Sequence, residues 1–317
     1  MSEAHPVSAQ GLVKRYGEIV AVDHVDLTVE TGDVFGYLGP NGAGKTTSLR
    51  MMLGLIRPTE GRVQLFGLDP LVDGARALAG VAGFVEGPAF YPYLSGRRNL
   101  QLLADYDDEG ARHRIDEVLD LVELRDRAKD KVGGYSHGMR QRLGIAASLL
   151  RAPRLLLLDE PTTGLDPAGM RDMRALVKRL AGEGITVLLS SHLLSEVEEL
   201  CKRVAIIRSG RIVFAGPLAE LMATAGTGYR LRTNDPVRAR AICLVQSGIQ
   251  DVLDDGGELR FSADEDAVAE LSVALGEAGI GIVALVPEAA SLEELFLGLT
   301  EGEEPPIPEP ELAEAAA

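Results

Sequence analysis

A short glycine-rich run has the residue types and the spacing of a phosphate-binding loop. It matches the pattern G-x-x-x-x-G-K-[S/T] without a substitution, and its members are Gly39, Pro40, Asn41, Gly42, Ala43, Gly44, Lys45 and Thr46. Glycines let successive backbone N–H groups converge on phosphate oxygens. We expect Lys45 to reach the β- and γ-phosphates and the Thr46 hydroxyl to bind Mg²⁺. The run therefore predicts binding of a nucleoside triphosphate.

The residues on either side of this run provide the context that a phosphate-binding loop requires. Residues 34–38 are apolar and predict a buried strand before the loop, and residues 47–53 predict a helix behind it. The N-terminus of that helix adds the positive end of its dipole to the anion site. Thr47 opens the helix and is included among the nucleotide-binding residues. A glycine-rich turn without a ligand would leave the Lys-Thr pair unexplained.

Two acidic residues end a second apolar run. The leucines at 155–158 predict a strand that is buried on both faces, and Asp159 and Glu160 follow it. The carboxyl ends of such strands form the edge at which α/β sheets bind ligands. Beside a phosphate loop, Asp159 is the expected carboxylate on the Mg²⁺ side, and Glu160 is the expected polariser of an attacking water. The alternative is a pair of acids at a helix start.

Two further residues have both a functional and a plain interpretation. A predicted strand at 184–191 delivers His192 to the same sheet edge, where it is either a site residue or a polar surface residue. Tyr16 occupies a predicted turn, where its ring could stack on adenine or pack beside the turn.

The composition limits the class of protein. The 317 residues are 46% hydrophobic and 25% charged, which favours a globular chain with one large α/β domain and a smaller one. The net charge of −16 makes nucleic acid an unexpected partner. The two cysteines, Cys201 and Cys243, lack the spacing of a zinc site and are expected to be reduced. Without a span of roughly 20 apolar residues or an apolar N-terminal core, we expect a soluble intracellular chain.

The order of these segments over about residues 7–220 resembles the nucleotide-binding subunit of an ATP-binding cassette (ABC) transporter. Residues 39–46 resemble the Walker A loop, and residues 155–160 resemble the Walker B strand with its catalytic glutamate. The resemblance implies that Tyr16 is the adenine platform, that His192 senses the γ-phosphate, and that Asp166 belongs to the D-loop at the ATP site. ATP and Mg²⁺ are the implied cofactors, and Lys45, Glu160 and His192 are the implied catalytic residues.

Residues 135–139, Tyr-Ser-His-Gly-Met, stand where the family has its Leu-Ser-Gly-Gly-Gln signature. Only Ser136 and Gly138 match the family pattern, whereas His137 and Met139 depart from it. In the family this helix N-terminus caps the γ-phosphate held by the opposite subunit, which is chemically sensible for a helix start and a serine hydroxyl. The resemblance therefore implies a head-to-tail homodimer in the ATP-bound state.

A second departure points to a branch of the family. Glu86 stands where the family usually has a glutamine that joins the Mg²⁺ site to the helical subdomain, and we expect it to contribute an oxygen ligand. With residues 87–92 it resembles exporters that protect against bacitracin-like or lantibiotic peptides. The implied function is an ATPase that drives export of a drug or antimicrobial peptide through a separate membrane permease, on the cytoplasmic side of the membrane. The alternatives are an importer ATPase and a soluble ABC ATPase without a membrane subunit.

The expected fold is an α/β P-loop ABC ATPase core with an antiparallel β subdomain and a helical subdomain, followed by a small α+β domain. The domain boundaries are 1–224 for the ATP-binding domain, with the helical subdomain at about 87–150, and 228–300 for the accessory domain. Residues 301–317 predict a disordered acidic Pro/Glu tail. The aromatic run at 90–93 is either a docking surface for the permease or a small local core under a loop.

Overall fold

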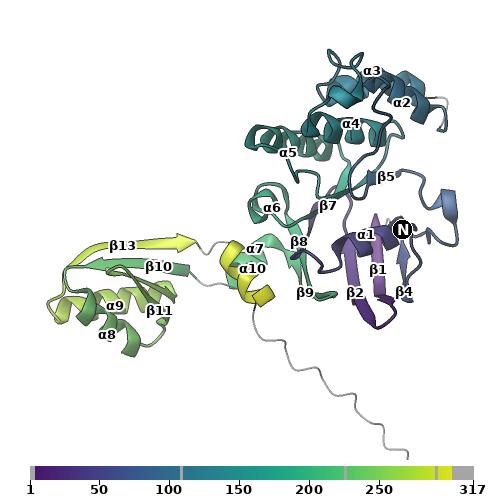
Figure 1. Cartoon of the computed structure of the whole chain (residues 1–317). Coiled ribbons are helices and arrows are strands. Elements are labelled where there is room, and N and C mark those ends of the chain that lie inside the picture. The colour runs from purple at the N-terminus through teal and green to yellow at the C-terminus, as the bar shows by residue number, and fades with distance from the viewer. Residues whose placement is uncertain (1–3, 108–109, 225–226, 290–291, 302–317) are drawn as a thin grey trace, which may run out of the picture.

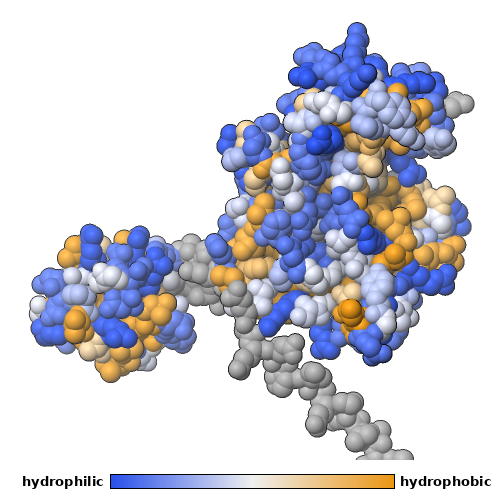
Figure 2. All heavy atoms as spheres, in the orientation of Figure 1, coloured by the Kyte–Doolittle hydropathy of each residue, from blue (hydrophilic) through white to orange (hydrophobic). Residues whose placement is uncertain are grey.

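The structure, a computed structural model, describes residues 4–107, 110–224, 227–289 and 292–301. Figure 1 shows a larger part that contains β1 to β9 and a smaller unit that contains β10 to β13. Of the helices in these residues, none combines the length and the apolar character that crossing a bilayer requires. On the face drawn in Figure 2, hydrophilic side chains cover much of both parts, and hydrophobic side chains gather on the larger part.

A six-stranded sheet with the order β5-β6-β7-β3-β8-β9 forms the centre of the larger part. Its strands are β3 (Val34–Leu38), β5 (Val81–Phe84), β6 (Leu155–Asp159), β7 (Thr186–Ser191), β8 (Arg203–Arg208) and β9 (Arg211–Pro217). All neighbouring pairs are parallel except β8 and β9. Every residue of β3, β6 and β7 is buried, as expected for strands that are covered on both faces. Successive leucines of β6 enter two different apolar cores, one on each face.

A second sheet covers one face of this centre. It has the order β2-β1-β4, is antiparallel, and consists of β1 (Val7–Tyr16), β2 (Ile19–Val29) and β4 (Glu60–Gln64). Helix α1 (Lys45–Met52) packs against all three strands and against β6. Leu49 and Met52 of α1 join the same core as Tyr37 of β3. The helix behind the phosphate loop is therefore held between two sheets.

A helical part lies at the other end of the sheet, next to β5 and α5 (Figure 1). Its helices are α2 (Gly96–Ala104), α3 (Ala111–Leu121) and α4 (His137–Leu149), with a 3-10 turn η2 (Val132–Gly134) before α4. Ser95 caps α2 by accepting a hydrogen bond from the backbone N–H of Arg98 at 3.2 Å. Leu100, Leu119 and Leu143 are fully buried where the three helices meet.

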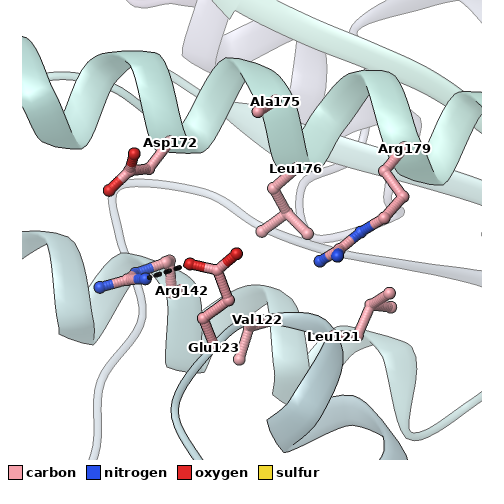
Figure 3. Close-up of a pocket in the computed structure, with 8 residues that line it drawn as sticks. All are labelled: Leu121, Val122, Glu123, Arg142, Asp172, Ala175, Leu176 and Arg179. Carbon is pink, nitrogen blue, oxygen red and sulfur yellow. Dashed lines mark ion pairs between the residues drawn. The ribbon is translucent and has the colours of Figure 1, made fainter.

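A cleft of about 240 Å³ marks the joint between this helical part and α5 (Pro167–Gly182) (Figure 3). Arg142 of α4 forms an ion pair with Glu123 at 3.6 Å on one wall, and Asp172 and Arg179 of α5 stand on the other. None of the residues that line this cleft belongs to the predicted nucleotide site. The cleft is therefore a feature of the joint and not of the ATP site.

The smaller unit is a four-stranded antiparallel sheet with the order β11-β12-β10-β13 and two helices. Its elements are β10 (Thr227–Thr233), α8 (Pro236–Val245), β11 (Gln250–Asp255), β12 (Glu258–Ala263), α9 (Glu265–Glu277) and β13 (Ile282–Ala289). Figure 1 shows both helices on the same side of the sheet. The rings of Tyr229 and Phe261 stack at 5.9 Å between centroids, and Leu271 is fully buried, so this unit has its own core.

The chain returns to the larger part after β13. Helix α10 (Leu292–Glu301) packs beside α6 (Leu194–Leu200) and α7 (Leu218–Thr224). Leu292 and Phe296 join the core of the larger part, and the backbone N–H of Leu292 donates to the Glu198 carboxylate at 3.1 Å. The smaller unit is therefore attached at both of its ends, by α7 and by α10.

The structure confirms the expected α/β core with its antiparallel β subdomain and helical subdomain, and the small α+β unit. Several elements lie in segments for which we make no prediction from the sequence, namely α5, α6, α7, β8, β9 and the 3-10 turn η1 (Gly74–Arg76). The first residue of the predicted tail, Glu301, belongs to α10, and the remainder of that tail lies outside the described residues.

The packing of β6 predicts a large cost for shortening one of its side chains. Leu157 is fully buried between the two sheets, so Leu157→Ala should lower the free energy of unfolding by about 2–5 kcal/mol. Leu55→Ala is the matched control, because Leu55 is 64% exposed and should change stability by less than about 0.5 kcal/mol. Denaturant unfolding followed by circular dichroism measures both. Equal effects of the two variants would contradict the described packing.

Candidate nucleotide site

The glycines of the phosphate loop are required by the packing of the loop itself. Gly42 and Gly44 have φ angles of 82° and 106°, in the left-handed region that favours glycine. A Cβ on Gly44 would lie 2.4 Å from the carbonyl oxygen of Ala21 in β2, and one on Gly39 would lie 2.4 Å from that of Ile207 in β8. The loop is thus pressed against both sheets, and a side chain at either position would displace it.

Lys45 is buried at the start of α1 and places its ammonium group inside the loop. Nζ donates to the carbonyl oxygens of Gly39 at 2.7 Å and Pro40 at 3.2 Å. It also lies 3.4 Å from Oε1 of Glu160. The loop therefore contains a cation beside converging backbone groups, which is the arrangement that binds phosphate.

Asp159 is a buried carboxylate at which three elements meet. Its Oδ2 accepts a hydrogen bond from Thr46 Oγ1 of α1 at 2.9 Å, and its Oδ1 accepts one from Ser190 Oγ of β7 at 2.5 Å. The backbone N–H of Glu86, just beyond β5, donates to Oδ2 at 3.4 Å. The sequence predicted Asp159 and Thr46 together, and the structure brings them into direct contact.

These oxygens fit the chemistry of Mg²⁺. The ion prefers hard oxygen ligands and commonly uses one or two carboxylates together with substrate phosphates and waters. Thr46 and Asp159 offer a hydroxyl and a carboxylate oxygen side by side at the phosphate loop. Within the described ranges, no cluster of three or more His, Cys, Asp or Glu side chains could hold a metal ion alone. A metal at this site would therefore need oxygens from a nucleotide and from water.

The carboxylate of Glu160 has three polar neighbours at the same sheet edge. Its Oε2 accepts a hydrogen bond from Thr163 Oγ1 at 2.9 Å and lies 3.0 Å from Nδ1 of His192. Lys45 lies near the other oxygen. Burial raises the pKa of Glu160, but the Thr163 hydrogen bond and the charges of Lys45 and His192 outweigh it, so the pKa lies below its usual value. The group is ionised at neutral pH and can polarise a water molecule.

The backbone at Glu160 turns sharply after β6. Its φ angle of 48° is in the left-handed region, which costs about 1–2 kcal/mol for a residue with a side chain. The Glu160 N–H donates to the carbonyl oxygen of Ser190 at 3.2 Å and to its Oγ at 3.0 Å. Strand β7 therefore holds this turn in place through Ser190.

Glu86 lies near the predicted metal site with its side chain turned away. Its carboxylate forms an ion pair with Arg50 of α1, and the side chain is 65% exposed. The backbone N–H contacts Asp159, whereas the structure gives the carboxylate no contact with Thr46 or Asp159. A role of Glu86 as a metal ligand would require it to leave Arg50, and it stays a prediction.

Ser136 and Asp166 both cap helices. Ser136 precedes α4, and its Oγ accepts from the Met139 N–H at 3.2 Å; Asp166 precedes α5 and accepts from the Gly169 N–H at 3.0 Å. Gly138 follows in the first turn of α4, close to Leu165. The N-terminus of α4 thus presents backbone donors at the surface, which suits an anion.

Tyr16 stands at the end of β1 and is about half exposed. The Lys14 ammonium group lies 5.1 Å from the centre of its ring, close enough for a cation–π contact. Ala21, on the paired strand β2, lies against Gly44 of the phosphate loop. The hairpin that carries Tyr16 therefore touches the loop, and its stacking on adenine stays a prediction.

Some residues at this edge carried no signal in the sequence. Ser190 was visible only as part of an apolar strand, and its role depends on the register that pairs it with Asp159. Nothing in the sequence marks Thr163, and its hydrogen bond to the Glu160 carboxylate becomes visible only in the structure. His137, noted as a departure from the signature, approaches the carbonyl oxygen of Thr163 with Nε2 at 3.0 Å. Because the acceptor is a carbonyl, Nε2 carries the proton.

The sequence profile of the ABC transporter family matches residues 22–163. The chain is 38% identical over 298 residues to the bacitracin transport ATP-binding protein BcrA of Bacillus licheniformis, covering 93% of this chain and 97% of that protein. It is also 38% identical over 304 residues to the daunorubicin resistance ATP-binding protein DrrA3 of Streptomyces coeruleorubidus, covering 93% and 95%.

Solved structures agree with the fold. An ATP-binding subunit of an ABC transporter superposes with a TM-score of 0.62 at 26% identity, over 69% of this chain and 92% of that one. A dimeric ATP-binding cassette in a post-hydrolysis state, bound to ADP and Pi, superposes with a TM-score of 0.61 at 27% identity, over 67% and 98%.

The contact between Thr46 and Asp159 predicts a specific effect on metal-assisted binding. Thr46→Ala should reduce the gain in ATP affinity that Mg²⁺ provides by about 10- to 100-fold, because a metal-side oxygen is lost. Thr46→Ser keeps the hydroxyl and should behave as wild type. Titrations of ATP with and without Mg²⁺ measure the gain. An equal loss of affinity in both conditions would contradict the assignment of Thr46 to the metal.

Proposed function

The chain belongs to the ATP-binding proteins of the ABC transporter family, and from this premise we propose that it powers export of a drug or an antimicrobial peptide through a separate membrane permease. The chain is an ATPase. The observation that supports export is the likeness along 93% of the chain to proteins named for bacitracin transport and daunorubicin resistance. The substrate would be recognised by the permease, since the site in this chain is built for phosphate.

In the proposed mechanism, each group at the sheet edge has one task. The loop N–H groups and Lys45 would bind the phosphates, and Thr46 and Asp159 would hold Mg²⁺, which when bound supplies positive charge to neutralise them. Glu160 would accept a hydrogen bond from the attacking water, since its lowered pKa keeps it ionised. His192 would hold the Glu160 carboxylate from the side opposite Lys45.

The proposed working state is a head-to-tail homodimer. Ser136 and Gly138 lie at the exposed N-terminus of α4, whose backbone donors would face a phosphate bound by the second copy. A related cassette is described as a dimer with ADP and Pi, which supports this arrangement. We also propose the division into an ATP-binding domain at 1–224, a helical subdomain at about 87–150 and an accessory domain at 228–300. The last helix of the accessory domain, α10, packs into the core of the ATP-binding domain.

The proposed contact with the permease is the aromatic segment of the helical part. A groove of about 430 Å³ is lined there by Ala89, Phe90, Tyr91, Asn99, Leu102, Leu103 and Tyr106. Buried Asn99 holds the segment by accepting from the Tyr91 N–H at 2.8 Å and donating to the Tyr91 carbonyl at 3.1 Å. Exposed aromatic side chains beside a formed groove are typical of protein interfaces. Such a contact would keep the chain at the cytoplasmic side of the membrane.

The export function is tested by trapping the transporter. Glu160→Gln removes the charge that polarises water but leaves Lys45 and the loop, so it should bind ATP and lose hydrolysis by at least about 100-fold. It should then accumulate as a closed dimer in size-exclusion chromatography. Capture of this variant with ATP from detergent-solubilised membranes of its own cells should recover a multi-span membrane protein, identified by mass spectrometry.

Wild-type protein with ADP is the control for that capture and should recover less of the permease. Recovery of ribosomes or DNA-repair proteins in place of a membrane protein would overturn the transporter proposal. Hydrolysis at the normal rate would remove Glu160 from its proposed role.

The exposure of the aromatic segment predicts that a variant can lose binding to the permease while it keeps ATP binding. Tyr91 and Tyr93 are 54% and 64% exposed, so changing both to alanine should leave ATP binding unchanged and weaken permease capture by about tenfold or more. Val245→Ala, on the exposed surface of the smaller unit, is the control and should have no effect. Unchanged capture by the tyrosine variant would contradict the proposed docking surface.

A further inference from the structure

Glu196 is a buried acidic residue to which the mechanism above gives no task. It lies in the first turn of α6 and is 1% exposed. Its Oε2 accepts hydrogen bonds from Ser191 Oγ at 2.7 Å and from Thr162 Oγ1 at 3.0 Å, whereas its Oε1 has no hydrogen-bond partner. Burying a carboxylate with one oxygen unpaired is costly.

Its two partners stand next to the two residues of the proposed hydrolytic pair. Thr162 follows Glu160 by two positions, and Ser191 immediately precedes His192. Both partners are themselves 2% exposed, so neither bond competes with solvent. Ser191 Oγ also accepts from the N–H of Leu193 at 3.0 Å, which turns the chain after β7. One carboxylate oxygen therefore joins the segment after β6 to the last residue of β7.

We propose that Glu196 is a positioning residue for ATP hydrolysis, which fixes the distance between Glu160 and His192 by holding Thr162 and Ser191 on one oxygen. This inference rests on the roles proposed above for Glu160 and His192. Glu160 adopts a left-handed backbone conformation, so its turn needs external contacts to persist. Ser190 supplies one such contact by accepting the N–H of Glu160 itself, and Glu196 supplies another by accepting the Thr162 hydroxyl, two residues further on. A displacement of about 1 Å in such a pair can cost about 100-fold in rate.

The single shared oxygen gives a sharp test. Glutamine can place its carbonyl oxygen where Oε2 stands and accept both hydroxyl hydrogen bonds, whereas alanine accepts neither. We expect Glu196→Ala to lower kcat about 10- to 100-fold while the KM for ATP changes by less than about threefold, because the phosphate loop is untouched. Glu196→Gln should restore kcat to within about threefold of wild type. A residue that served only the stability of the core would not separate kcat from KM in this way.

Thr162→Val and Ser191→Ala keep the proposal testable if Glu196→Ala does not fold. Each removes one hydroxyl from the shared oxygen, and each should lower kcat with little change in KM. Thermal unfolding of every variant establishes that it is folded at the assay temperature. Wild-type kcat in folded Glu196→Ala, or in both hydroxyl variants, would overturn the positioning role.

Glu160→Gln, assayed in parallel, distinguishes a failure of the role proposed for Glu160 from a failure of the role proposed for Glu196. If Glu160→Gln abolishes hydrolysis and Glu196→Ala does not affect it, only the positioning role is wrong. If Glu160→Gln retains hydrolysis, the proposed role of Glu160 is wrong, and the positioning of Glu160 by Glu196 is overturned with it.

Discussion

The buried carboxylate of Asp159 is the contact on which the geometry of the nucleotide site depends. It sits at the end of β6 and binds the side chains of Thr46 and Ser190, which belong to α1 and β7. A charged group in the interior is stable only when it is well hydrogen-bonded. A slip of one residue in the register that pairs Asp159 with Ser190 would therefore remove the hydrogen bond to Oδ1 of this buried carboxylate. The same register delivers Glu160 and His192 to one edge.

The charges at this sheet edge link phosphate binding to the pKa of Glu160. Lys45 divides its contacts between the loop carbonyls and Glu160, and its charge is one of the causes that lower the pKa of Glu160. A phosphate in the loop would oppose this effect, because its negative charge disfavours the ionised carboxylate. A Mg²⁺ ion held by Thr46 and Asp159 would favour the ionised carboxylate, because its charge is positive.

Features encoded in a few adjacent residues could be predicted from the sequence, whereas contacts that depend on strand register could not. The phosphate loop and the leucine strand with its two acids were predicted because each is encoded in a few adjacent residues. The contact between Glu86 and Arg50 joins residues 36 positions apart, and the bond between Ser190 and Asp159 spans 31. No spacing rule predicts such pairs, because a strand or a loop can present the same side chain to several neighbours. The buried partners of Glu196 were missed for that reason.

Helix α6 shows why the site and the smaller unit are structurally connected. Glu196 points from this helix into the hydrolytic edge, and Glu198, two residues later, accepts the backbone N–H of Leu292 at the start of α10. Residues two apart on a helix lie on different faces, so one short element has contacts with the nucleotide site on one side and with the returning chain on another. The core in which Leu292 and Phe296 are buried also includes Val197 and Leu200 of α6. A shift of α6 would therefore act both on its bonds to Thr162 and Ser191 and on the docking of α10, because all of these contacts are made by one short helix.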